Sequence, residues 1–442
     1  MQEALLQTPE KTTEISAEKI RGFVKLCIPF SVKKYASVRK IASDLRKSRT
    51  SAETEDVQDS RYGFLLKYIQ SAFCDNAVCF EKADPHPTFF VSHGADRRLA
   101  PIRVEKAEAF VFETRVGILS LQVAFSEDID EITDICAALR NATTFPILKE
   151  TAEETALSFD LRTVAQTILT DLGFRSFTLF GYRADPRQER ADMFSALLLN
   201  EDIYTDDQLR RCGFSLANGY DTRIDPQELN GAEYYYPHTN ILWCFSKRGA
   251  SAIACATPRD KEHLNNRWIV NVQDTYFRMF ILALHQKYAI YNYLHAVTVA
   301  SDLQSLKKYQ KEIIEFNTKY VFKIVSDEYF YQQVYTSMVK AMHVDVVYED
   351  LNDELQKLLE YTELNKNNGL SNAAFLLSAV CSVSALIDTY NFFVSEFGFS
   401  ATASLETVWV FWLALLAEFL LCIVGILFFA KPIFHWIFRK KY

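Results

Sequence analysis

Two apolar stretches near the C-terminus dominate the pattern of hydrophobic and polar positions along the chain. The first covers residues 371–391 and the second 407–430, and neither lysine nor arginine occurs between positions 371 and 430. At about 1.5 Å per residue, a helix of roughly 20 residues nearly spans the hydrocarbon core of a bilayer. The pattern therefore predicts two transmembrane helices, joined by an extracytoplasmic loop at 392–406 and followed by a basic cytoplasmic tail at 431–442.

Basic residues set the expected orientation of this hairpin. Lys366 precedes the first helix and Lys431, Arg439, Lys440 and Lys441 follow the second, whereas the connecting loop carries no basic residue. Positively charged flanks of membrane helices stay in the cytoplasm. We therefore expect a multi-pass protein of the cell inner membrane, bound to the lipid bilayer, with the N-terminus and the C-terminus cytoplasmic.

A different pattern, typical of a mixed α/β domain, occupies residues 1–258. Residues 109–125 read as two strands that turn near Arg115, and Leu119, Leu121 and Val123 alternate with polar residues in the second strand. This alternation predicts a sheet with one buried face. Residues 161–172 predict a helix, and residues 239–256 predict a hairpin that turns at 247–249.

Long helices are expected after this domain. Between Pro258 and Phe397 the chain contains no proline and a single glycine, Gly369. Such a composition permits uninterrupted helices. The expected fold is thus a cytoplasmic α/β domain, a long helical stalk at 259–370 and the C-terminal two-helix transmembrane hairpin.

Composition narrows the function. The formal charge of −8 argues against a general nucleic-acid binder, which would carry a basic excess. Nine cysteines without paired spacings give no zinc motif, so the sequence identifies no metal ligands. No phosphate-binding loop, dinucleotide-binding turn or catalytic motif is present, and we expect no enzymatic activity.

The first apolar stretch carries a stripe of small and hydroxylated side chains. At helical spacing, one face of this stretch contains Ser371, Ser378, Ser382 and Thr389. One interpretation is close packing of helices in lipid, which small residues permit. The other is the lining of a pore, which a two-helix hairpin forms only as a homo-oligomer.

An acidic residue, Glu418, lies near the middle of the second stretch. Ionisable groups at that depth are costly and face other helices or a water-filled cavity. Two interpretations stay open: a protonated Glu418 bonded to a hydroxyl of the first helix, or a role in ion passage or gating.

The order of these segments resembles the CorA family of divalent-cation channels, in which the first span lines the pore of a homopentamer. That family ends its first span with a Gly-Met-Asn signature. Residues 388–392 here read Asp-Thr-Tyr-Asn-Phe, so that only Asn391 and the following aromatic residue agree. The resemblance implies that Asn391 belongs to the pore lining with the serine stripe, and that the signature's magnesium selectivity is not retained.

CorA-like proteins without this signature also occur as membrane effectors of type III CRISPR systems, and the chain resembles that branch. The resemblance implies a channel in antiviral defence, gated by a nucleotide second messenger of the S-adenosylmethionine–AMP type bound to the cytoplasmic domain. Two alternatives stay open: a transporter of magnesium-type divalent cations, and a non-conducting membrane scaffold.

A pocket for a small adenine-containing anion requires aromatic side chains for the base and arginines for the phosphate. Two local clusters provide these residue types. Arg175, Arg183 and Arg187 belong to the basic cluster, and Tyr235 and His238 to the aromatic one. Each cluster has a plainer interpretation as ordinary surface or core.

Overall fold

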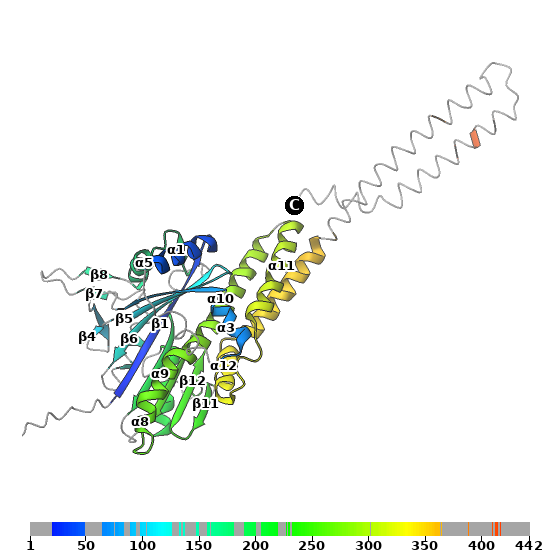
Figure 1. The fold of residues 1–442 in the computed structure, drawn as a ribbon. Helices are drawn as coiled ribbons and strands as arrows, with labels where there is room; N and C mark the ends of the chain where they lie inside the picture. The colour runs from blue at the N-terminus through cyan, green and yellow to red at the C-terminus, as the bar shows by residue number, and fades with distance from the viewer. Residues whose placement is uncertain are drawn as a thin grey trace, which may run out of the picture. The chain divides into compact units, whose positions relative to one another are not determined.

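The chain forms two compact units in the computed structural model (Figure 1): residues 1–299 with 311–352, called the first unit below, and residues 300–310 with 353–442. The structure describes residues 20–48, 64–74, 76–83, 89–93, 98–102, 104–125, 147–149, 157–159, 161–180, 190–199, 205–219, 232–300 and 302–362. It also describes the single positions 132, 133, 136, 137, 227, 229, 364, 388, 409, 412, 413 and 416.

A mixed nine-stranded sheet forms the centre of the first unit. Its strands are β1 (Ile20–Val32), β2 (Ala77–Ala83), β5 (Val104–Phe112), β6 (Val116–Phe125), β9 (Phe177–Leu179), β10 (Asp192–Leu199), β11 (Glu233–His238), β12 (Ile241–Ser246) and β13 (Gly249–Cys255). The order is β11-β12-β13-β10-β1-β6-β5-β2, with β9 paired to β1. Only the β10–β13 pair is parallel among the described pairs. A second sheet has the order β4 (Arg98–Ile102), β3 (Phe89–His93), β7 (Ile147–Lys149) and β8 (Leu157–Phe159).

Both predicted hairpins are confirmed. β5 and β6 turn at residues 113–115, where Arg115 adopts a φ of 68°, and β12 and β13 turn at 247–248. The expectation of one buried face in β6 is wrong, because Ser120 and Gln122 are buried as well as Leu121. Their face of the sheet is covered by helices.

One face of the sheet packs against α1 (Tyr35–Ser48), α5 (Leu161–Asp171) and α6 (Asp206–Asn218). The predicted helix at 161–172 corresponds to α5, which buries Leu161, Ala165, Ile168 and Leu169 at helical spacing. Helix α6 begins at a capping box between Thr205 and Gln208, and Gly219 ends it with a φ of 64°.

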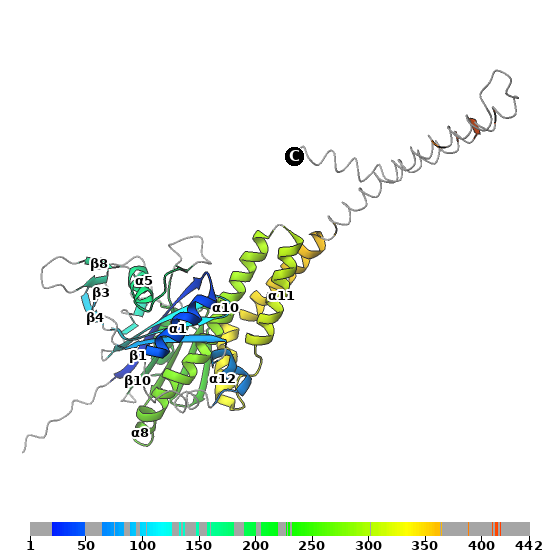
Figure 2. The same ribbon diagram turned by 45° about the horizontal axis from the view of Figure 1, so that its top comes forward.

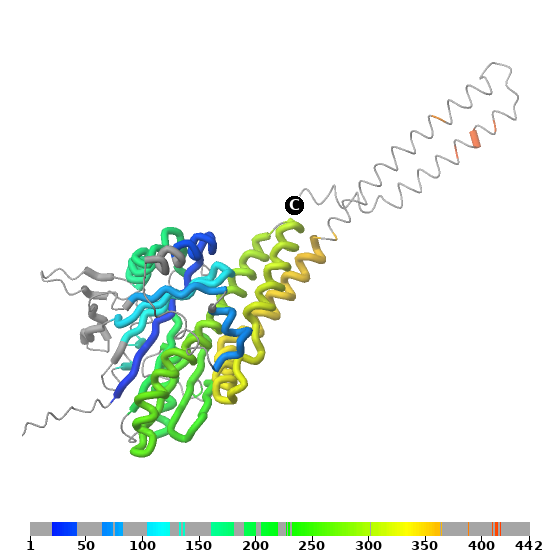
Figure 3. Tube along the Cα trace, in the orientation of Figure 1, coloured from blue at the N-terminus to red at the C-terminus, as the bar shows by residue number. Residues whose placement is uncertain are grey.

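The opposite face is covered by a helical run that follows β13 directly, seen as the green segment in Figure 3. The run comprises α8 (Lys261–His263), the π-helical segments η2 (Leu264–Trp268) and η3 (Val272–Tyr276) on either side of α9 (Ile269–Asn271), and α10 (Phe277–Val299). The chain continues through α11 (Leu303–Tyr320) to α12 (Tyr329–Ala341), which packs on β11 and β12. Figure 2 shows the same elements turned by 45°. A short helix, α3 (Lys67–Cys74), contacts β2.

Buried charges lie between the sheet and this helical run. Glu108 accepts hydrogen bonds from Lys25 and Lys106, both at 3.1 Å, and Arg278 lies close enough to act on its pKa. Burial opposes ionisation of Glu108, but the three cations outweigh it and hold the pKa at about 2. Burial likewise pulls the pKa of Lys25 downward against Glu108, its principal counter-charge.

A second buried group links β10 to α10. The Lys287 Nζ lies 3.5 Å from the Asp192 carboxylate and donates to the Lys247 carbonyl at 2.8 Å, and the Tyr288 hydroxyl donates to Asp192. Such pairs are costly to bury, so they hold the packed geometry rather than add much stability.

The predicted fold class needs a correction in its membrane part. None of the helices built from described residues combines the length and the apolarity needed to cross a bilayer. Helix α10 has 23 residues, but it carries Arg278, Gln286 and Lys287 and is buried against the sheet. The described architecture is a mixed nine-stranded sheet with helices, without a transmembrane hairpin.

The same finding overturns the predicted localisation as a multi-pass inner-membrane protein with both ends cytoplasmic. That prediction rested on the apolar composition of 371–391 and 407–430. These ranges lie outside the described residues, apart from Asp388, Trp409, Trp412, Leu413 and Leu416.

Replacing Glu108 by glutamine tests the buried ion group. The substitution leaves Lys25 charged and buried without its carboxylate, so we expect the free energy of unfolding to fall by about 3–5 kcal/mol. Urea denaturation followed by circular dichroism measures the change. Glu81→Gln is the matched control, because Glu81 accepts from the same Lys106 at 3.0 Å but is more exposed; it should cost less than about 1 kcal/mol.

The pH dependence has a defined sign. The pKa of Glu108 is lower in the folded state than its ordinary value of 4.5. The contribution of ionised Glu108 to the free energy of unfolding is therefore complete above pH 4.5 and is lost as the pH falls toward about 2. Equal losses in the two variants, or no difference in acid sensitivity between wild type and Glu108→Gln, would contradict this assignment.

Candidate functional site

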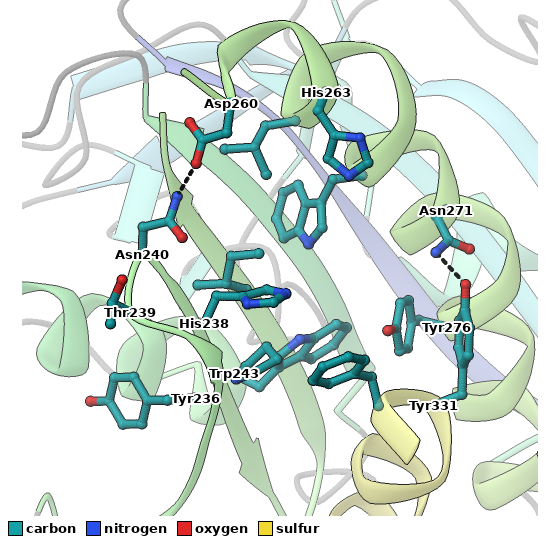
Figure 4. A pocket seen from close by; sticks show the side chains of 15 residues that line it. Tyr236, His238, Thr239, Asn240, Trp243, Asp260, His263, Asn271, Tyr276 and Tyr331 are labelled. Atoms are coloured by element: carbon teal, nitrogen blue, oxygen red, sulfur yellow. Dashed lines mark hydrogen bonds between the residues drawn. The ribbon is translucent and has the colours of Figure 1, made fainter. Parts of the chain in front are cut away.

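A cavity of about 1080 Å³ lies at one end of the sheet, between the β11–β12 hairpin, the helical run and the start of α12 (Figure 4). It is comparable with the largest ordinary small-molecule sites. All its described lining residues belong to the first unit. Aromatic rings and uncharged polar groups predominate among them.

The hairpin supplies one wall through a register shift in β11. Tyr235 pairs with Trp243 and His238 with Ile241, so one extra residue is accommodated between Tyr235 and His238. In a regular strand, residues three apart point to opposite faces. The β-bulge therefore brings His238 to the face that carries Trp243, and Pro237 occupies the edge-strand position where its missing N–H is tolerated.

The helical run supplies the facing wall. His263, Trp268, Asn271 and Tyr276 line the cavity, and the last three fall in or beside the two π-helical segments. Such segments are rare and are frequent at functional sites, because they alter the direction of side chains relative to a regular α-helix. Their presence here, twice within thirteen residues, is a structural mark independent of the cavity itself.

Ring contacts join the two walls to α12. The Trp243 and Tyr276 rings have centroids 4.9 Å apart, and Tyr276 stacks on Tyr331 at 4.7 Å. On the hairpin side, His238 lies 5.4 Å from the Phe330 ring. Aromatic contacts at these separations are favourable. They hold the rings that face the cavity, where a planar ligand ring would meet them.

The polar part of the wall begins at the hairpin turn. Asn240 donates to the Asp260 carboxylate at 2.6 Å, and Asp260 also accepts from the Thr257 amide and the Thr257 hydroxyl, each at 2.7 Å. Burial opposes ionisation of Asp260, but these hydrogen bonds outweigh it and lower the pKa. Asp260 therefore stays an anion and an acceptor at neutral pH.

On the helical side, Asn271 donates to the Tyr331 hydroxyl at 2.6 Å. The Tyr276 hydroxyl points into the cavity in Figure 4. Burial raises the pKa of both tyrosines, so both hydroxyls stay protonated and neutral.

The described lining residues differ from those of a typical phosphate-binding or metal-binding site. Among its described lining residues, Asp260 is the one permanently charged group, and neither lysine nor arginine occurs. The described part of the chain also holds no cluster of three histidine, cysteine or acidic residues suited to a metal. What the cavity offers is aromatic faces with oxygen and imidazole groups between them.

The residues predicted from the sequence fall in different places. His238 lines the cavity, and Tyr235, in the same strand, lies close enough to Tyr276 to affect its pKa. The Tyr235 hydroxyl is buried without a hydrogen-bond partner among the described residues. Arg175 is exposed before β9, which pairs with β1, and β12, β13 and β10 lie between β1 and β11. The structure does not bring Arg175 to the cavity.

The other predicted site residues lie outside the described part of the chain. These are Arg183 and Arg187 of the basic cluster, Ser371, Ser378, Ser382, Thr389 and Asn391 of the predicted pore lining, and the intramembrane acid Glu418.

Sequence reasoning missed most of the cavity. Trp268 and Tyr276 recur at helical spacing within an apolar segment, which is the ordinary signature of a buried helix face. Tyr331 comes almost ninety residues after the hairpin and shows no relation to it in the sequence. A usable signal was the density of tyrosine and histidine at 234–238, which did identify the right hairpin.

Comparisons with known proteins found no match of any kind. No protein-family model, no curated protein and no solved structure matches the chain.

Removing the Tyr331 hydroxyl tests whether its hydrogen bond to Asn271 holds the wall. Tyr331→Phe leaves the Asn271 amide without this acceptor, and we expect a loss of about 0.5–1.5 kcal/mol in the free energy of unfolding, measured by urea denaturation. Tyr329→Phe is the matched control, since Tyr329 is 64% exposed. If this hydrogen bond holds the wall, Tyr329→Phe should leave the free energy of unfolding unchanged. Indistinguishable effects of the two substitutions would refute this role of the bond.

Proposed function

We propose that the first unit is a receptor domain that binds a small molecule with a planar aromatic ring, and that the ligand is a nucleotide messenger containing a nucleobase. The observation that carries the proposal is the aromatic cavity between a bulged hairpin and a helical run with two π-helical segments. The proposal concerns binding and not catalysis.

The ring chemistry supports a base. Stacking of a base on an aromatic side chain contributes about 1–3 kcal/mol and tolerates different bases, because every base has a π-face. Trp243, Trp268, Tyr276 and Phe330 come from three separate segments and line the same space. Figure 4 labels Trp243 and Tyr276 among them, and Phe330, which is 41% exposed, presents the most accessible of the four rings. Several partly enclosing rings suit a flat heterocycle better than an extended chain or a sugar alone.

The charge pattern favours a phosphate bound outside the aromatic part of the cavity. Without lysine or arginine among the described lining residues, a phosphate inside the cavity would have no permanently charged partner. Arg210 lies beside the rim, where its Nε donates to the hydroxyl of the lining residue Tyr236 at 2.8 Å. The Asp206 carboxylate also lies 3.0 Å from the Arg210 Nε. We therefore assign the base to the cavity and the anionic part of the ligand to the rim.

The class of messenger in this proposal comes from the resemblance to CorA-like CRISPR effectors. The cavity supports the part of that resemblance that concerns a base-containing ligand. Its acceptors and neutral rings favour the nucleoside portion of such a messenger as the part that is enclosed.

Titration of the full-length protein with adenosine 5′-monophosphate, followed by calorimetry, tests the proposal. Phe330 is 41% exposed at the rim, so Phe330→Ala should remove a stacking surface without unfolding the domain. We expect the dissociation constant to rise about 5- to 150-fold, which corresponds to about 1–3 kcal/mol.

Tyr329→Ala is the matched control, because Tyr329 is the adjacent aromatic residue and does not line the cavity. It should bind like the wild type. Absence of binding by the wild type, or equal weakening in both variants, would rule out the aromatic cavity as the nucleotide site.

A further inference from the structure

Asn240 has its side-chain amide held in one orientation. The Nδ2 group donates to the Cys255 carbonyl at 2.9 Å and to the Asp260 carboxylate at 2.6 Å. An amide nitrogen has two hydrogens, and a carbonyl oxygen and an ionised carboxylate can only accept. Reversing the amide would place its oxygen against two acceptors, so the chemistry of the neighbours fixes the assignment of nitrogen and oxygen.

The partners of Asn240 are themselves held. The Cys255 amide donates to the Asn240 carbonyl at 2.9 Å, which completes a two-way contact between the hairpin turn and the end of β13. Asp260 accepts from the amide and the hydroxyl of Thr257, and these bonds lower its pKa and keep it from acting as a donor.

The side-chain oxygen of Asn240 is left free by these contacts. With both hydrogens engaged on the protein side, Asn240 presents its Oδ1 toward the cavity (Figure 4). No described residue donates a hydrogen bond to this oxygen. Oδ1 is therefore a preset acceptor beside the aromatic rings, and a ligand that displaces water from it has to supply a donor or leave it unsatisfied.

We propose that Asn240 Oδ1 accepts a hydrogen bond from an exocyclic amino group of the ligand ring, so that the cavity selects amino-substituted heteroaromatic rings, the class of adenine and cytosine, over their keto counterparts. The inference rests on the proposed function and adds the specificity of the site. An exocyclic amine donates to Oδ1. A keto oxygen at the same place would set acceptor against acceptor.

The remaining polar groups fit this selection. His238, His263 and the Tyr276 hydroxyl can each donate or accept, so they can meet the ring nitrogens of either class and do not discriminate. Asp260 adds negative charge near Oδ1, which favours a donor further. Among the described lining residues, Asn240 is the one whose hydrogen-bond partners fix the orientation of its amide.

Adenosine and inosine provide the test, because they differ in a donor amine or an acceptor oxygen at the same ring carbon. The dissociation constants of full-length protein for both nucleosides are measured by calorimetry. We expect adenosine to bind roughly tenfold to a hundredfold more tightly, as for a polar group that the bound ligand covers and either pairs or leaves unpaired. In Asn240→Ala the two constants should converge, through weaker adenosine binding and unchanged inosine binding.

Asn266→Ala is the matched control, because Asn266 is exposed on η2 and does not line the cavity; it should keep the full preference for adenosine. If Asn240→Ala binds neither nucleoside, Asn240→Ser takes its place, since serine suits a turn and can still donate to Asp260. A preference retained in the folded position-240 variant would assign selection to another residue and overturn the inference.

The remaining outcomes separate this inference from the proposed function. Equal binding of both nucleosides by the wild type would overturn the inference and leave the aromatic receptor site intact. Binding of neither at millimolar concentration would overturn the receptor function itself. Tetramethylammonium, which has no N–H, is the third probe; if it displaces adenosine at equal concentration, the rings read positive charge and the inference falls.

Discussion

The arrangement of the first unit depends on one buried contact between the sheet and the helical run. Lys25, in the central strand β1, donates to the Gln273 carbonyl inside η3 at 3.0 Å and lies 3.7 Å from the centre of the Phe277 ring. Gln273 also donates to Gln122 of β6 at 2.8 Å. A side chain that takes a carbonyl within a helix competes with the regular i→i−4 bonds. The sheet thus engages the helix at the point where the helix departs from α geometry.

The position of that contact connects the core to the cavity. Tyr276, at the end of η3, lines the cavity, while Lys25 holds the other side of the same segment. Lys25 is buried together with Glu108. Loss of the Glu108 charge would therefore alter the contact of Lys25 with η3, whose backbone positions the side chains of Tyr276 and Asn271. The polar core and the aromatic cavity are two sides of one short helical segment.

Much of the sheet could be predicted from the sequence, and the reason is local. The hairpins β5–β6 and β12–β13 have alternating or continuously apolar strands around short polar turns. This pattern lies within a few residues and is sufficient to predict a hairpin. The polar Ser120 and Gln122 misled the prediction of an exposed face, because burial of β6 on both sides depends on α10, more than 150 residues later. Segment η3 has no sequence signature, and the contact at it between Lys25 and the Gln273 carbonyl joins residues 248 apart in the sequence.

Prediction of the candidate site was partial for the same reason. A cluster of aromatic residues at 234–238 is visible locally, and Tyr235 and His238 belong to the cavity wall or its support. The basic cluster was chosen by residue type alone, and Arg175 lies elsewhere on the sheet. The transmembrane prediction drew on apolar composition, which describes a segment without its surroundings, and the described helices do not bear it out.

The distribution of the cavity wall along the chain has a consequence for biosynthesis. The hairpin turn at Asn240 leaves the ribosome about 90 residues before Tyr331, which at about 5–20 residues per second is a delay of roughly 5–18 s. During this interval the sheet and the helical run can associate, but Phe330 and Tyr331 are absent and the aromatic faces remain open to water. A nascent chain therefore acquires the complete cavity as one of the last steps in folding the first unit, and a ribosome that pauses between these positions would display an unfinished one.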